Sequence, residues 1–83
     1  MAIKAQEAAR KAADYYREIS GEISYRQEVT VEEVEMDGGY WIITLGFAEQ
    51  SYSLNSPKSK DYKIFKVDVA SGDIISMKIR TLN

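Results

Sequence analysis

Residues 61–83 read DYKIFKVDVASGDIISMKIRTLN, and this stretch decides the fold. Apolar and polar side chains alternate on both sides of Ala70–Asp73, which is the period of a β-strand with one buried face. Within that segment, Ser71-Gly72-Asp73 supplies the small and polar residues of a tight turn. The stretch therefore predicts a β-hairpin whose strands run over Tyr62–Val69 and Ile74–Leu82.

The first twenty residues predict a helix. Residues 2–20 are rich in Ala, the best helix former, and their apolar side chains recur every three or four residues. Gly21 follows as a natural helix stop, because glycine adopts a positive φ without steric cost.

A second hairpin is predicted between the helix and the final strands. Residues 28–36 and Tyr40–Phe47 alternate as strands do, and Asp37-Gly38-Gly39 between them is a strong turn signal. A change of phase at Glu32-Glu33 predicts a β-bulge. Residues 48–60, rich in Ser and Asn and with one Pro, predict a loop.

Together these elements predict an α+β fold in which one N-terminal helix packs on a four-stranded antiparallel sheet, in the order αββββ. A chain of 83 residues suffices for one core, so we expect a single domain over residues 1–83. The predicted core consists of Ala9, Ala12, Tyr16, Ile19, Val29, Val31, Trp41, Ile43, Leu45, Phe65, Val67, Ile75, Met77 and Ile79.

The composition excludes several classes of protein. The sequence has no Cys and no His, which rules out a disulfide-stabilised scaffold, zinc sites built from Cys or His, and catalysis by imidazole. No apolar run approaches the ~18 residues that span a bilayer. We therefore expect a protein that does not associate with membranes and resides in the cytoplasm, or is exported if a leader has been removed from it.

The net charge of −2 hides an asymmetry along the chain. Residues 1–37 hold five basic and nine acidic side chains, whereas residues 57–83 hold six basic and three acidic ones. Such charges belong either to the solvated faces of separate elements or to opposite halves that dock head-to-tail.

No constellation of residues supports catalysis. Tyr62 and Lys66 have the spacing of a dehydrogenase pair, but that pair needs a helix, and on a strand four residues span about 13 Å. The acidic run Glu32–Asp37 lacks the spacing of a calcium loop and suits a solvated strand edge. We therefore expect no enzyme activity, cofactor or metal.

The predicted sheet face away from the helix is more apolar than solvation requires, and such a patch often marks a protein contact. We expect this face, or the loop at residues 48–60, to bind a protein partner or a second copy of the chain; the alternative is a scatter of surface aliphatics. Lysines around Tyr62 leave single-stranded nucleic acid as a less favoured partner, and a small ligand is a further alternative. The candidate contact residues are Tyr40, Ile42, Tyr52, Leu54, Tyr62, Ile64 and Ile74.

Three short motifs carry a resemblance to a known family. Val67-Asp68, then Ser71-Gly72-Asp73, then Ile74-Ile75 occur in the order typical of a PepSY-like unit, within the cystatin-like group of folds. The Asp37–Trp41 hairpin behind an Ala-rich helix also resembles the O-type accessory proteins of gas vesicles. The PepSY resemblance implies a domain that binds or restrains other proteins. Protease inhibition is not implied, because residues 27–31 lack the glycine of the cystatin motif.

Overall fold

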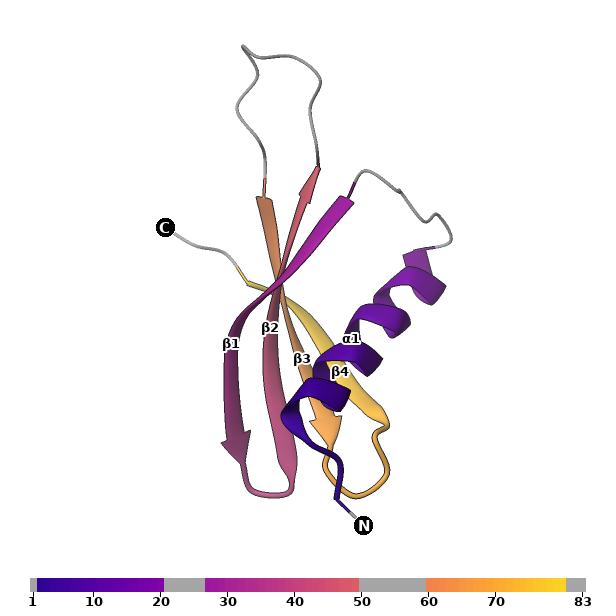
Figure 1. Cartoon of the computed structure of the whole chain (residues 1–83), viewed down its shortest axis with the longest axis vertical. Coiled ribbons are helices and arrows are strands. Elements are labelled where there is room, and N and C mark those ends of the chain that lie inside the picture. The colour runs from indigo at the N-terminus through magenta and orange to yellow at the C-terminus, as the bar shows by residue number, and fades with distance from the viewer. Residues whose placement is uncertain (1, 21–26, 50–59, 81–83) are drawn as a thin grey trace.

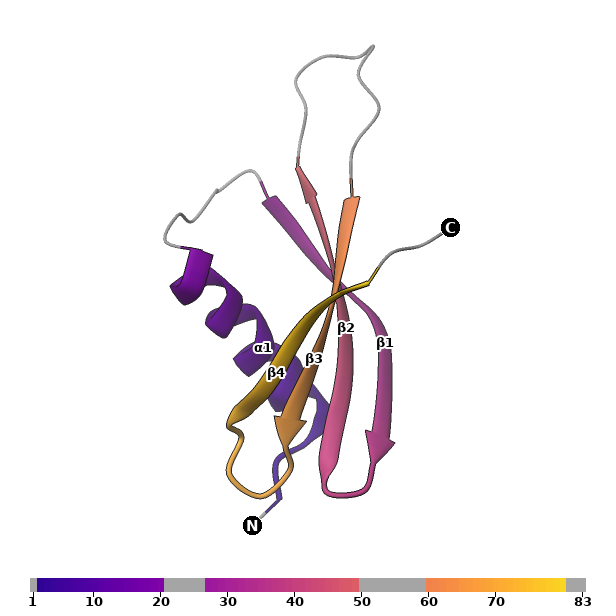
Figure 2. The same ribbon diagram turned by 180° about the vertical axis from the view of Figure 1, so that it is seen from behind.

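In the computed structural model of the chain, residues 2–20, 27–49 and 60–80 are described (Figure 1). The four strands form one antiparallel sheet in the order β1-β2-β3-β4, and the helix crosses one of its faces (Figures 1 and 2). This arrangement confirms the predicted αββββ fold. The elements are α1 (Ala5–Ser20), β1 (Gln27–Asp37), β2 (Tyr40–Glu49), β3 (Lys60–Asp68) and β4 (Ile74–Arg80).

The predicted loop at residues 48–60 is shorter than expected. Ala48 pairs with Lys60, so β2 and β3 continue into both ends of that segment. Residues 50–59, with the predicted contact residues Tyr52 and Leu54, lie outside the described part of the chain.

The helix contacts the sheet through alanine. Ala8 and Ala12 are fully buried against β2 and β3, together with Ile43, Leu45, Phe47, Phe65 and Val67. Methyl side chains keep the helix backbone close to the sheet, and the Tyr16 ring packs 4.2 Å from that of Phe47, between ring centroids. Ile19, which we expected in the core, is 50% exposed, because the last turn of α1 lies away from the strands (Figures 1 and 2).

Two bulges decide which side chains face the helix. The predicted bulge in β1 is confirmed, since the register with β2 shifts between Val31 and Glu33. A second, unpredicted shift places Ile74 opposite Val67 and leaves Ile75 as the extra residue. The assignments of Ile74 to the outside and Ile75 to the core were therefore wrong: Ile74 packs against the core and Ile75 is 51% exposed.

Two further predicted core residues lie on the edge strands. Val31 pairs with the buried Leu45 and Ile79 pairs with Lys63, on the helix side of the sheet. They are nevertheless 54% and 78% exposed, because the single helix does not cover the edge strands at these positions. The expectation that both are buried was wrong.

A chain of hydrogen bonds ties the segment before α1 to the end of the sheet. The Trp41 indole Nε1 donates to the Ile3 carbonyl (3.0 Å), and the Ile3 amide donates to the Val69 carbonyl (2.8 Å). The Val69 amide in turn donates to the Gly39 carbonyl (3.0 Å). These bonds connect both hairpins to the start of the helix and fix where the helix begins on the sheet.

Replacing Gly72 with Ala should destabilise the protein more than the same change at Gly39. Gly72 has a φ of +79°, and an added Cβ would lie 2.7 Å from Cε of Lys11. The positive φ costs about 1–2 kcal/mol for an L residue, and the contact adds little because the exposed end of the Lys11 side chain can move aside. We expect a loss of about 2 kcal/mol in the free energy of unfolding, measured by urea denaturation.

Two other glycines are matched controls for that experiment. Gly39→Ala meets no atom within 4 Å and has no positive φ, so it should change stability by less than about 0.5 kcal/mol. Gly38→Ala has a φ of +62° in open space and measures the backbone cost alone. Equal stabilities of the Gly72→Ala and Gly39→Ala variants would contradict the structure of this turn.

Candidate interaction surface

The sheet face opposite α1, here called the outer face, is covered by no element in the described parts of the chain (Figure 2). Side chains alternate along each strand, so the neighbours of the buried Ile43, Leu45 and Phe65 point to this face. The outer face is therefore assembled from Glu28, Thr30, Glu33, Glu35, Asp37, Tyr40, Ile42, Thr44, Tyr62, Ile64, Lys66, Asp68, Ser76, Lys78 and Arg80.

The outer face is divided by charge across the strands. Glu33, Glu35 and Asp37 on β1 form an acidic column, and Lys66 on β3 with Lys78 and Arg80 on β4 forms a basic column. Between the two lies an apolar centre of Tyr40, Ile42 and Ile64. One row across the sheet runs Glu35, Ile42, Lys66, Ser76, and the next runs Glu33, Thr44, Ile64, Lys78.

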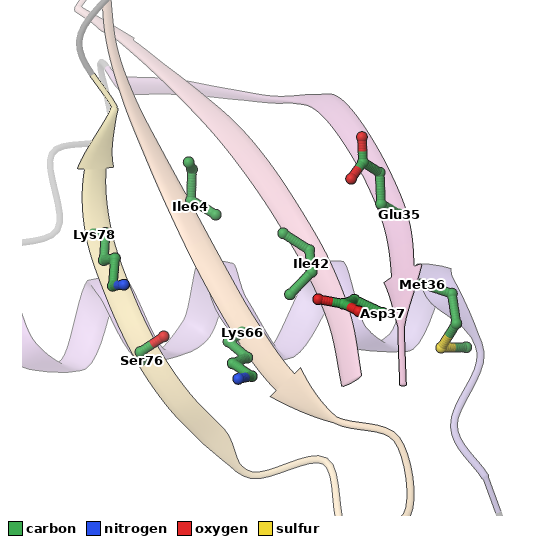
Figure 3. Close-up of a pocket in the computed structure, with 8 residues that line it drawn as sticks. All are labelled: Glu35, Met36, Asp37, Ile42, Ile64, Lys66, Ser76 and Lys78. Carbon is green, nitrogen blue, oxygen red and sulfur yellow. The ribbon is translucent and has the colours of Figure 1, made fainter. Parts of the chain in front are cut away.

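A hollow of about 550 Å³ lies over the apolar centre (Figure 3). Glu35 and Asp37 extend into it from β1, while Lys66 and Lys78 extend from β3 and β4, with α1 behind the sheet. Its floor is Ile42 and Ile64. The hollow thus combines an apolar base with carboxylates on one side and ammonium groups on the other.

One ion pair crosses the outer face. Arg80 Nη1 on β4 donates to Glu33 Oε1 on β1, so the pair bridges the two edge strands over β2 and β3. Thr44, which neighbours Glu33 in register, is only 4% exposed although it points to this face. This part of the face is therefore closed by its own side chains.

The remaining charges on the outer face are not neutralised in this way. Lys66 Nζ lies 4.4 Å from the centroid of the Tyr40 ring, a cation–π contact. Within the described sheet, no ion pair joins Glu35 or Asp37 to Lys66 or Lys78. Both signs of charge stay available around the hollow.

The structure brings four of the predicted contact residues together on the outer face: Tyr40, Ile42, Tyr62 and Ile64. Ile74 does not join them, because the β3–β4 bulge turns it toward the helix. The two charged columns were not identified from the sequence as parts of a site. The alternation of Glu33, Glu35 and Asp37 indicated one acidic row, but only the register between strands shows that the basic residues lie across the sheet from it.

A second exposed apolar surface lies on the other side of β1. Val31, Val34 and Met36, which we call the helix-side stripe, are 54%, 41% and 51% exposed. The β1 bulge puts all three on the helix side of the sheet, where α1 does not reach them. The stripe carries no charge of its own.

The described residues contain no group of three or more Asp, Glu, His or Cys side chains placed to hold a metal ion. Tyr62 and Lys66 both lie on β3, so they are held apart by the strand rather than paired on a helix. No helix among the described segments is long and apolar enough to cross a membrane.

Comparison with known proteins adds no relative to this description: no protein-family model, no curated protein and no solved structure matches the chain. The geometry of the sheet and its side chains therefore carries the functional argument.

The β3–β4 turn borders the outer face and is held by one carboxylate. Asp68 Oδ1 accepts hydrogen bonds from the Ala70 amide (2.8 Å) and the Ser71 amide (3.0 Å), and Ser71 Oγ accepts one from the Asp73 amide (3.2 Å). The two backbone donors, Ser71 above all and then Ala70, hold the pKa of the Asp68 carboxyl below its ordinary value of 3.8.

This arrangement predicts a contribution to stability that depends on pH. Because the folded pKa of Asp68 is lowered, the contribution is complete above pH 3.8 and is lost as the pH falls through the lowered value. The side-chain carboxyl ¹³C resonance of Asp68 should titrate with a midpoint below 3.8. Asp68→Asn should be less stable than the wild type at pH 7, and the difference should shrink at pH 2. A midpoint at or above 3.8 would contradict the turn geometry.

Proposed function

We propose that this domain is a non-catalytic protein-interaction or regulatory module, and that its outer face binds the surface of another protein molecule. The observation that carries the proposal is an uncovered sheet face with an apolar centre between an acidic and a basic column. Apolar area supplies free energy of association, while opposite charges select the partner and its orientation.

Binding of single-stranded nucleic acid is less favoured by the same face. A phosphate chain needs a continuous basic groove, but Glu35 and Asp37 flank the hollow, and Arg80 is already paired with Glu33. These carboxylates would repel phosphate.

A small ligand is also less favoured. The hollow of about 550 Å³ falls within the usual range of ligand sites, but such sites bury most of their ligand. Here the walls are side chains standing on one side of an exposed sheet (Figure 3). A second protein surface would close the hollow, whereas a small molecule would remain exposed to water.

The PepSY-like resemblance of the Val67–Ile75 segment points in the same direction, since members of that group bind or restrain other proteins. The helix-on-sheet arrangement of this chain is compatible with that group. We include membership of this group in the proposal.

Photo-crosslinking in the source cell tests the proposed function. A p-benzoylphenylalanine at Ile64, in the apolar centre, should form covalent adducts with a protein surface that approaches within a few ångströms. The same probe at Arg10, on the exposed side of α1, should form none. Introducing Ile42→Lys beside the Ile64 probe should abolish the adducts, because it places a charge in the apolar centre.

The outcomes separate the candidate surfaces. Absence of adducts at Ile64, or equal adducts at Ile64 and Arg10, would overturn the proposed function. A probe at Val34, in the helix-side stripe, provides the third arm: adducts there and none at Ile64 would assign binding to the other face of β1. Circular dichroism of each variant confirms that the fold is retained.

A further inference from the structure

We infer that the molecule bound by the outer face is a second copy of this chain, stacked face to face about a two-fold axis parallel to the strands. This inference rests on the proposed function and names its partner. It is carried by the order of charges across the sheet: acidic on β1, apolar on β2 and β3, basic on β3 and β4.

The pattern is self-complementary under one symmetry operation. In a two-fold dimer the same surface patch faces itself. An axis that lies midway between the two stacked sheets, parallel to the strands and centred over β2 and β3, exchanges the β1 edge and the β4 edge. It therefore places β1 of one copy over β4 of the other, with Glu33 over Lys78 and Glu35 over Ser76, next to Lys78. Around the axis, Ile42 lies over Lys66 and Ile64 over Thr44 of the other copy, so the apolar centre meets the methylene stem of Lys66 and the methyl group of Thr44.

Other two-fold arrangements oppose like charges. An axis in the plane between the sheets but perpendicular to the strands places β1 over β1, so that the two acidic columns face each other. Pairing the free edges of two β1 strands into a continuous sheet also brings Glu33, Glu35 and Asp37 of both copies side by side. Like charges in such contacts are destabilising, so the charge pattern selects the parallel axis.

The size of the face predicts a weak dimer. Four strands about 4.8 Å apart, with about seven paired residues of about 3.4 Å each, cover roughly 450 Å² in projection. A stable interface buries about 800 Å² per partner. We therefore expect weak association with a clear dependence on salt, because the charged columns lie at the rim of the contact.

Sedimentation equilibrium with charge-inverted variants tests the dimer. The wild type should dimerise between about 10 μM and 1 mM protein, and raising the salt from about 0.05 M to 0.5 M should weaken the dimer several-fold. Lys66→Glu with Lys78→Glu makes a largely acidic face, and Glu35→Lys with Asp37→Lys makes a largely basic one. Each variant alone should be monomeric, and an equimolar mixture should form a one-to-one dimer.

The matched control carries the same change of charge on α1 and on the residue just before it. Lys4→Glu with Arg10→Glu alters the net charge as much as the first variant does but leaves the outer face intact. It should dimerise within about twofold of the wild type. Equal weakening by the control would show that net charge, not the outer face, governs association, and would overturn the inference.

Cross-linking tests the direction of the axis. Stacked sheets lie about 10 Å apart, too far for a disulfide, so a short bis-maleimide is suitable. The sequence has no Cys, and single cysteines can be placed at Glu35 on β1 and Ser76 on β4, which share one row. A mixture of Glu35→Cys and Ser76→Cys chains should cross-link, whereas Glu35→Cys alone should not. Efficient cross-linking of Glu35→Cys to itself would overturn the proposed axis.

Failure of this inference differs from failure of the proposed function. A wild type that stays monomeric at 1 mM, while the Ile64 probe captures a different protein, would reject self-association and leave the outer face as a binding surface. A monomer whose Ile64 probe captures nothing would reject both.

Discussion

The structure depends on the contact of one alanine-faced helix with one side of the sheet. Ala8 and Ala12 are fully buried against β2 and β3, and the larger Tyr15 and Tyr16 pack against the core one turn further along α1. A 16-residue helix covers a narrow band of a four-stranded sheet, so the core is concentrated in the two central strands. The exposure of the edge strands, and of the whole outer face, follows from that geometry.

The two bulges adapt the edge strands to this narrow core. In β1 the extra residue is Glu32, and in β4 it is Ile75. Each bulge changes the phase of its strand partway along, so that side chains on both sides of it face the helix. The same phase changes keep the charges of β1 and β4 on the outer face, where they form the two columns. One bulge in each edge strand thus determines which of its side chains face the helix and which lie on the outer face.

The fold could be predicted from the sequence because local signals agree: helical spacing in residues 2–20, strand alternation, and glycine turns at Gly38 and Gly72. The burial of individual residues could not be predicted in the same way. Ile74-Ile75 is a continuous aliphatic pair, and nothing in its local pattern reveals which member is bulged. Ile79 alternates correctly but is exposed because the helix takes a path that no local pattern encodes.

The candidate surface was predictable only in part, for the same kind of reason. The aliphatic residues of the outer face follow from alternation within single strands. The opposition of acidic and basic columns depends on the register that joins Glu35 to Ile42 and Ile42 to Lys66. Register is a property of paired strands, so it becomes visible only when all four are assembled.

The bond from Trp41 to the carbonyl of Ile3 makes the single tryptophan an intrinsic optical reporter. Its indole is half-buried and tied to the segment that enters α1. Emission from this ring therefore senses whether that segment is seated on the end of the sheet, separately from the integrity of the strands. Fluorescence and far-ultraviolet dichroism recorded on one sample distinguish detachment of the helix start from global unfolding, without any added dye.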